Sequence, residues 1–294
     1  MKETYILGVK VNTGLTMSGV INHIDGMLSD GGFHYISTTN PEFIMDAQKD
    51  REFMSIINES DLSVPDGSGV LYAEYYLEKA AGLKRDTLLP LRAFVLGLQT
   101  GFDPRVVRQF PPKITGVDLV YKICEYAEMN NKSIFLLGGR KKDSYGRFIQ
   151  DGDDIATLTA DALKILYPRL RVIGSTSSYS CEDEDDADTV RYIKGCMVEH
   201  SVSYIDFLLV AYGHVRQEKW IDRNGYKIPA KVSVGVGGTF DYVCSNKKRS
   251  ANVFIKVNIE WLYKLITQPW RIKRIYKAFP AYPLKVFITS IRTS

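Results

Sequence analysis

The stretch Tyr204-Ile-Asp-Phe-Leu-Leu-Val-Ala-Tyr-Gly-His-Val-Arg-Gln-Glu-Lys-Trp220 decides the fold class of this chain. Its first seven residues are apolar apart from Asp206, which is the pattern of a strand buried in a core. The strand then passes through Gly213 into a cluster of polar side chains. Ligands of α/β proteins bind where strands end, so this cluster is a first candidate site. A strand that merely ends at a polar surface has the same pattern.

Short apolar and β-branched runs alternate with longer amphipathic ones along the chain. Strands are predicted at 35–39, 133–137, 170–174, 205–210 and 231–235, and helical spacing occurs over 118–129 and 155–166. This alternation predicts an α/β fold, with a Rossmann-like, mostly parallel sheet flanked by helices on both faces. Thr115-Gly-Val-Asp118 has the form of a capping box, so Asp118 is predicted to cap a helix rather than to act in catalysis.

Length and cysteine usage narrow the class further. The 294 residues suffice for one large domain or two small ones. The four cysteines stand far apart without zinc-site spacing, which favours a reduced, cytoplasmic setting. The first residues, MKETYILGVKVN, lack the apolar region of a signal peptide. Apolar stretches stay short of the roughly 20 residues of a spanning helix, so we expect no membrane crossing.

Charge is distributed unevenly along the chain. The net charge is +4, but residues from Lys256 onward carry +7 and the remainder carries −3. This favours an anionic partner for the basic end: a membrane surface, nucleic acid or a phosphorylated substrate. Apolar residues at helical spacing there predict an interfacial helix: Ile259, Leu262, Tyr263, Ile266 and Trp270. Residues 256–294 are therefore predicted to form a short, basic, helical appendage on a catalytic body of 1–255. The competing explanation for this apolar pattern is that the helix docks onto the protein's own core. The pattern is also compatible with a homo-oligomer.

Glycines follow two of the predicted strands, at Gly138-Gly139 and at Gly235, Gly237 and Gly238. Glycine lets backbone amides approach a phosphate closely. Neither turn completes GxGxxG or a P-loop, so a tight connection is an equally good explanation. The acidic run 182–188 is predicted to be a solvated loop rather than a metal site, because nothing fixes its carboxylates in a coordination geometry.

Several polar motifs occur in a distinctive order. They are Thr38-x-Asn40-Pro-Glu42, Asp66-Gly67, Thr115-Gly-Val-Asp-Leu119, Phe135-Leu-Leu-Gly-Gly139, Arg216-Gln-Glu-Lys-Trp220, Gly235-Val-Gly-Gly-Thr-Phe-Asp241, Glu260-Trp-Leu-Tyr-Lys264 and Pro269-Trp-Arg-Ile-Lys-Arg274. In this order, from about Ser37 to Arg274, the chain resembles the WecG/TagA/CpsF family of bacterial glycosyltransferases.

The resemblance implies inverting, metal-independent transfer of a sugar, ManNAc-like or a related hexose. The donor is a UDP-sugar, and the acceptor is a polyprenyl-diphosphate-linked sugar at the inner face of the cell membrane. Such reactions build teichoic acid or other cell-surface polysaccharides. We expect no cofactor and no nucleic-acid partner, since no module that reads nucleic acid is recognisable. The alternative is a non-catalytic, membrane-associated protein of the same fold that binds nucleotide sugars.

The resemblance also assigns residues. Asp66 is the general base, with Thr38 and Asn40 nearby in its pocket. Gln217 hydrogen-bonds the donor and Glu218 shapes the pocket around it. The remaining substrate-binding residues are Gly138, Gly139, Gly237, Asp241, Lys264, Arg271 and Arg274. The last three supply cations to the diphosphate, although a lysine lacks the guanidinium fork. Contact with anionic lipid is an equally good role for the two arginines, and the two roles do not exclude each other. Nearby His214 could contact the acyl group or carboxylate of the sugar, but it is predicted to face solvent.

One segment departs from the family pattern. Between Asp66 and Thr115 the chain is longer than the resemblance leads us to expect, with an apolar insertion at about 87–110. Residues 88–98 are apolar on nearly every side of a helix, so they either pack into a core or meet lipid. We expect a second contact with the membrane or with the acceptor lipid.

Overall fold

A computed structural model describes residues 1–110, 114–139, 154–244 and 272–292. Its centre is a six-stranded, wholly parallel sheet in the order β4-β3-β8-β7-β5-β6, so the predicted α/β class is confirmed. The strands are β3 (His34–Thr39), β4 (Leu62–Pro65), β5 (Ser133–Gly138), β6 (Arg171–Thr176), β7 (Ile205–Ala211) and β8 (Ala230–Gly235). All five predicted strands are present. Strand β4 was missed because four residues carry too little periodicity.

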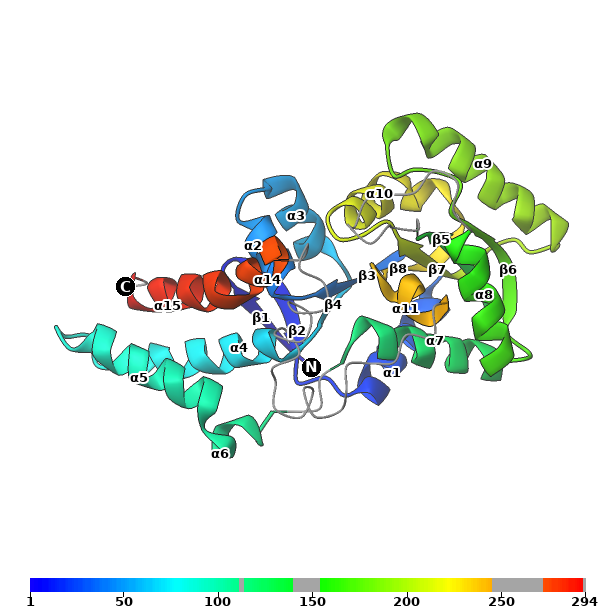
Figure 1. Ribbon diagram of the computed structural model, residues 1–294. Helices are drawn as coiled ribbons and strands as arrows, with labels where there is room; N and C mark the ends of the chain where they lie inside the picture. The colour runs from blue at the N-terminus through cyan, green and yellow to red at the C-terminus, as the bar shows by residue number, and fades with distance from the viewer. Residues whose placement is uncertain (111–113, 140–153, 245–271, 293–294) are drawn as a thin grey trace.

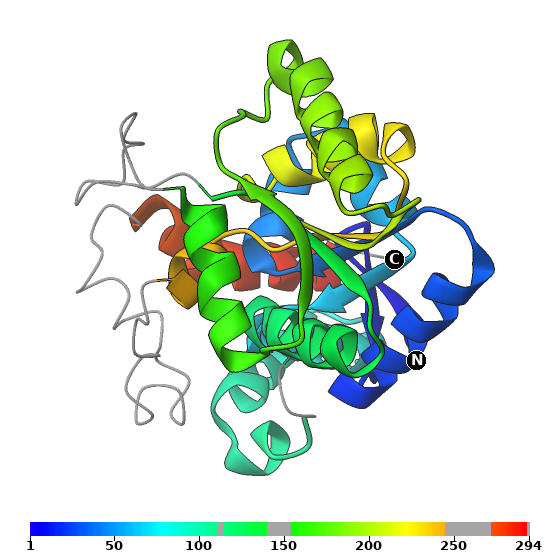
Figure 2. The same cartoon turned by 90° about the vertical axis from the view of Figure 1, so that its right-hand side faces the viewer.

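Helices cover both faces of the sheet, as Figures 1 and 2 show. One face packs against α1 (Met17–Asp30), α7 (Gly116–Met129), α8 (Ile155–Leu166) and α11 (Thr239–Cys244). The other face packs against α9 (Asp183–Glu199) and α10 (Arg216–Asn224), and η1 (Gly225–Lys227) follows α10. With both faces covered, every residue of β5 and β7 is buried.

Local capping fixes where the helices begin. The Thr115 hydroxyl accepts from the Asp118 N–H at 3.2 Å and donates to the Asp118 carboxylate at 2.7 Å, which confirms the predicted cap of α7. Asp154 caps α8 in the same way, through a bond of 2.9 Å from the Thr157 N–H. The predicted helix at 155–166 coincides with α8.

A separate core lies beside the β4 edge of the sheet. An antiparallel hairpin, β1 (Lys2–Ile6) with β2 (Val9–Thr13), packs there against α2 (Pro41–Ala47), α3 (Arg51–Glu59) and α4 (Ser68–Ala81). The C-terminal segment joins it through α14 (Ile272–Tyr276), η3 (Lys277–Ala281) and α15 (Tyr282–Arg292). Tyr282 and Val286 of α15 are buried in this core.

Two further helices extend from this core, α5 (Leu89–Phe102) and α6 (Pro104–Val107). Figure 1 shows α4, α5 and α15 grouped at the end of the molecule away from β6. Within the described ranges, no helix combines the length and the apolar character needed to cross a membrane.

The strand order locates the place where such folds bind ligands. The chain passes outward from β3 to β4 in one direction and from β5 to β6 in the other. Parallel sheets form a crevice at the carboxyl ends of the strands where the winding reverses. Here β8 and β7 lie between the two outward-winding pairs, so the crevice falls at the ends of β3, β8 and β7.

Candidate functional site

Asp66 lies directly after β4, beside the end of β3. Thr39 and Pro65 are opposite each other in the parallel pair, and the Asp66 N–H donates to the Thr39 carbonyl at 2.8 Å. Asp66 also forms an isolated parallel bridge with Ile114. The next residue, Gly67, has φ of 91°, which favours glycine and turns the chain sharply into α4. Asp66 is thus a partly buried residue whose backbone is held by the end of β3 and by Ile114.

Thr38 and Asn40 hold the backbone around Asp66. The Thr38 hydroxyl donates to the Gly235 carbonyl at 3.1 Å and so ties the end of β3 to the end of β8. The Asn40 side-chain oxygen accepts from the N–H groups of Glu42 and Phe43 at 2.9 and 3.1 Å, which caps α2. The structure therefore brings the three residues predicted to be catalytic to one edge of the sheet.

The beginnings of α7 and α11 meet the end of β3. A Cβ atom placed on Gly116 would lie 3.7 Å from the Thr239 hydroxyl oxygen and 4.0 Å from that of Thr38. Two motifs that are far apart in sequence, at 115–119 and 235–241, thus converge on Thr38. Asp241 lies in the first turn of α11, on the same side of the sheet.

Gln217 is buried and bonded to protein groups at both ends of its amide. Its oxygen accepts from the Gly237 N–H at 2.8 Å, and its nitrogen donates to Glu218 Oε1 at 2.7 Å. A Cβ atom on Gly235 would lie only 2.6 Å from Gln217 Nε2 and from Glu218 Oε1, so a larger residue there would displace this buried pair. The Gln217–Glu218 pair therefore fixes the turn that follows β8.

Among the described acids near this edge, Glu218 has the pKa that departs furthest from its ordinary value. Its side chain is fully buried, and burial raises its pKa to about 8. Oε2 has no hydrogen-bond partner, and the buried hydroxyls of Tyr35 and Ser233 are also unpartnered. Because the uncharged form of a buried carboxyl is favoured, Glu218 carries its proton at neutral pH.

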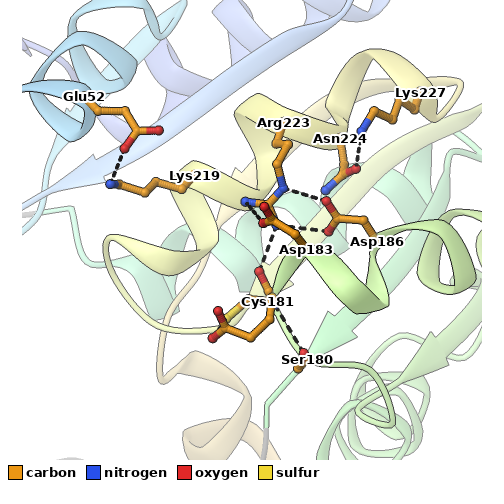
Figure 3. Close-up of polar contacts among 10 residues, drawn as sticks. Glu52, Ser180, Cys181, Asp183, Asp186, Lys219, Arg223, Asn224 and Lys227 are labelled. Carbon is orange, nitrogen blue, oxygen red and sulfur yellow. Dashed lines mark hydrogen bonds and ion pairs between the residues drawn. The ribbon is translucent and has the colours of Figure 1, made fainter.

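Helix α10, which carries this pair, is anchored on two sides (Figure 3). Arg223 donates to both carboxylate oxygens of Asp186, at 2.5 and 3.0 Å, and forms an ion pair with Asp183 at 3.1 Å. On the other side Lys219 forms an ion pair with Asp50 at 2.9 Å. At its start, Val215 has φ of 70°, which is rare for a β-branched residue.

These contacts correct the prediction for the acidic run. Residues 182–188 are not a solvated loop, because α9 begins at Asp183. Acidic side chains in a first turn are favoured by the helix dipole, and Arg223 neutralises two of them. Among the described residues, no group of three or more His, Cys, Asp or Glu side chains has the arrangement of a metal site.

The glycines after β5 have steric reasons of their own. Cβ atoms there would lie 2.9 Å from the Tyr212 ring for Gly138 and 3.1 Å from the Phe240 ring for Gly139. The Gly139 N–H donates to the Ala211 carbonyl at 3.1 Å. In this conformation the amides of Gly139 and Gly237 are therefore both bonded to the protein and do not point at a ligand.

The C-terminal segment contacts α2, next to Asn40. Arg274 Nε donates to Glu42 at 2.6 Å, and Lys277 is paired with Asp46. His214 Nε2 also lies 2.9 Å from Asp46, so the prediction that it faces solvent is wrong. Burial acts to raise the pKa of Asp46, but the bonds to His214 and Lys277 hold it below its usual value. Lys264 and Arg271 lie outside the described residues.

Sequence reasoning missed this acidic partner of the C-terminal segment. Glu42 belongs to a quoted motif, and Asp46 lies four residues further on, which places both on one face of α2. That spacing was the available signal.

A cavity lined by Lys132, Ser133 and Asp206 lies at the opposite, amino-terminal edge of the sheet, away from the residues gathered here.

Fold and site define an α/β protein of the doubly wound class, with its polar residues gathered at the carboxyl ends of the central strands. The chain belongs to the glycosyl transferase WecG/TagA/CpsF family, whose model matches residues 4–86 and 105–294. It is accordingly a glycosyltransferase, as the motif resemblance implies. Residues 87–104, which contain α5, are left unmatched.

Curated relatives share one name, N-acetylglucosaminyldiphosphoundecaprenol N-acetyl-beta-D-mannosaminyltransferase. The protein of Bacillus subtilis (strain 168) is 28% identical over 85% of this chain and 78% of its own length. That of Bacillus spizizenii (strain ATCC 23059 / NRRL B-14472 / W23) is 24% identical over 90% and 84%. That of Staphylococcus aureus (strain MRSA252) is 25% identical over 96% and 91%.

Proposed function

We propose that this protein transfers N-acetylmannosamine, or a closely related hexose, from a UDP-sugar to N-acetylglucosamine carried on a polyprenyl diphosphate. The names of the relatives support the sugar and the acceptor, and the order of motifs supports the UDP donor. The product belongs to a teichoic acid or another cell-surface polysaccharide. The enzyme works as a peripheral protein at the inner face of the cell membrane, where a lipid-linked acceptor is available.

The placement of Asp66 carries the proposal. Asp66 brings a carboxylate to the strand-end crevice, and its backbone is held there by the Thr39 carbonyl and by the bridge to Ile114. In the proposed reaction the acceptor hydroxyl oxygen bonds to the anomeric carbon while the bond from that carbon to UDP breaks. UDP leaves with the electron pair, and Asp66 takes the hydroxyl proton. A single displacement of this kind inverts the anomeric carbon, so an α-linked UDP-sugar would give the β-linkage in the relatives' name.

The neighbouring residues have supporting roles in this scheme. Thr38 and Asn40 position the backbone around Asp66 through their bonds to β8 and α2. Gln217 and Glu218 fix the turn at Gly237, which we assign to the donor side. Gly138, Gly139 and Asp241 line the neighbouring strand ends on that side.

Cations assist the departing diphosphate in this scheme. Arg274 is 45% exposed and paired with Glu42 beside Asn40, so it can exchange that carboxylate for a phosphate. Lys264 and Arg271 join it by family resemblance. We propose that the reaction needs no metal ion; the family resemblance supports this, and two carboxylates of the acidic run, Asp183 and Asp186, are already paired with Arg223.

Transfer can be measured by mass spectrometry with UDP-N-acetylmannosamine and detergent-dispersed polyprenyl-diphosphate-N-acetylglucosamine. Asp66→Asn is nearly isosteric but a far weaker base, and it should lower turnover by about 100-fold or more. Asp118→Asn, in an acid assigned to a cap, should keep most of the activity. Equal rates in wild type and Asp66→Asn would remove Asp66 from the role of base.

Two further outcomes separate the alternatives. Chelation with EDTA should leave the rate unchanged, whereas inhibition reversed by manganese contradicts a metal-free reaction. Binding of UDP-sugar without transfer to any lipid-linked acceptor would favour the non-catalytic binding protein.

A further inference from the structure

Helix α5 has an outward face that is apolar and uncharged. The large side chains along it, and that of its N-cap Leu88, are about half exposed: Leu88 53%, Leu91 60%, Phe94 55%, Val95 44%, Leu98 46% and Phe102 77%. Their spacing of three and four residues places them along one side of the helix. The opposite side buries Leu89, Ala93 and Thr100 where α5 packs on α4 and α15. An exposed apolar stripe of this length marks an interaction surface.

Charged groups are excluded from the stripe. Arg92 is the one charged residue between 87 and 102, and it donates to the Asp86 carboxylate at 2.9 Å and to the Lys84 carbonyl at 3.0 Å. The stripe belongs to the segment that the family model leaves unmatched, so it is a feature of this chain and not of the shared body.

Basic residues border the stripe at both ends. Lys84 and Arg85 precede α5, and Arg105 and Arg108 follow it. The two acids in the segment are engaged locally, Asp86 with Arg92 and Asp103 as the cap of α6. The neighbouring helix α15 adds Lys285 and Arg292 and contains no acid. An apolar stripe between clusters of bases is complementary to an anionic lipid surface, which offers acyl chains below a layer of phosphates.

We propose that α5 docks this enzyme on an anionic phospholipid bilayer, with the stripe Leu88, Leu91, Phe94, Val95, Leu98 and Phe102 inserted between the headgroups. Its 14 residues span about 21 Å, less than the hydrocarbon core, so α5 lies along the surface and not across the membrane. The proposal rests on the proposed function only in that a lipid-linked acceptor gives docking its use.

The segment is connected at both ends to the catalytic edge. Helix α4 leaves from Gly67, and the chain returns from α6 to Ile114, which bridges to Asp66. After α6, Phe110 packs against α4. Its ring centroid lies 4.6 Å from that of Tyr72 and 5.5 Å from that of Tyr75. Binding of α5 to a bilayer therefore holds Asp66 at a fixed distance from the lipid headgroups. The diphosphate of the acceptor lies at the level of these headgroups.

A second copy of the chain is a poorer occupant of this face. If two α5 helices paired in parallel, the bases that precede one helix would meet the bases that precede the other. If they paired antiparallel, the bases that precede one helix would meet the bases that follow the other. Either arrangement sets like charges against each other, whereas phosphate headgroups neutralise them.

The test is flotation with vesicles of phosphatidylglycerol and phosphatidylcholine, using the full chain. The α5 variant carries three changes on the stripe: Leu91→Ser, Phe94→Ser and Leu98→Ser. The matched control carries three changes at exposed apolar side chains on other helices: Ile165→Ser, Val198→Ser and Tyr226→Ser. These control positions are 80%, 77% and 82% exposed. We expect vesicle binding of the α5 variant to fall on the order of 100-fold and that of the control to stay unchanged.

Two results with the α5 variant overturn the proposal at this step. One is equal vesicle binding by wild type and the α5 variant. The other is unchanged vesicle binding with a loss of self-association in sedimentation velocity, which would assign the stripe to a second copy. Wild-type binding should also weaken with pure phosphatidylcholine, and equal binding to both lipids contradicts the role given to the bases.

A gentler variant protects the test against misfolding. Phe94→Trp keeps the stripe apolar and is made with Trp261→Phe and Trp270→Phe, which leaves only the buried Trp220 as background. Brominated lipid should quench the new fluorophore, whereas Ile165→Trp in the same background should stay bright. Absence of quenching at position 94 overturns the proposal.

An activity comparison separates this inference from the proposed function. The α5 variant should transfer sugar to a short-chain, water-soluble acceptor at the wild-type rate and lose activity on acceptor embedded in vesicles. If the α5 variant is as fast as the wild type on both acceptors, the docking role is overturned. No transfer by the wild type to either acceptor refutes the proposed function and leaves the flotation result standing.

Discussion

The buried carboxyl of Glu218 should make the stability of this protein depend on pH, and Glu218→Gln should remove that dependence. Glutamine has the same shape, and its side-chain oxygen can still accept from Gln217 Nε2, as Glu218 Oε1 does at 2.7 Å. It has no proton to release. The substitution therefore isolates the ionisation of the carboxyl from its packing.

The size of the effect follows from the pKa difference. The ordinary glutamate value is 4.5, and burial raises the folded-state pKa to about 8. Between these values the unfolded chain has lost a proton that the folded chain retains, so the free energy of unfolding falls as pH rises and levels off above the folded pKa. At about 1.4 kcal/mol per pKa unit, the proton that the folded chain retains and the unfolded chain releases lowers the free energy of unfolding by about 3 kcal/mol at pH 7.

Urea denaturation of both proteins across pH 5 to 8 measures this directly. The variant should be more stable by about 3 kcal/mol at pH 7, and the difference should shrink to about 1 kcal/mol or less at pH 5. Glu199→Gln, at the exposed end of α9, controls for the loss of one surface charge. Parallel pH profiles for wild type and Glu218→Gln would refute the burial of the carboxyl on which this reasoning depends.

Three other substitutions test the scaffold of the site. Gly235→Ala forces a Cβ to within 2.6 Å of Gln217 Nε2, so we expect a loss of about 2 kcal/mol in thermal unfolding and a lower rate of sugar transfer. Arg223→Gln removes the ion-pair partner of Asp183 and Asp186, and urea denaturation should show a loss of about 2 kcal/mol. Thr115→Ala removes the cap of α7 and should cost about 1 kcal/mol by the same measurement, with transfer largely retained.

Local pattern was sufficient where a feature depends on neighbours in sequence. The apolar run of β7 indicated burial on both faces, and the alternation of such runs with amphipathic ones indicated the parallel sheet. The cap at Thr115 was readable because its hydroxyl bonds to a backbone N–H only three residues away. The order of the motifs was sufficient to indicate the family, which the family model confirms.

The environment of the site depends on residues that are far apart in sequence, so only the tertiary structure decided it. The polar sequence around Gln217 and Glu218 suggests exposure, yet both are buried because β8 and its turn pack on them. The acidic run forms a helix start that Arg223 holds from 37 positions away. Arg274 and Glu42 are 232 positions apart. Sequence periodicity reports only local geometry, whereas desolvation and charge pairing arise when separate segments pack together.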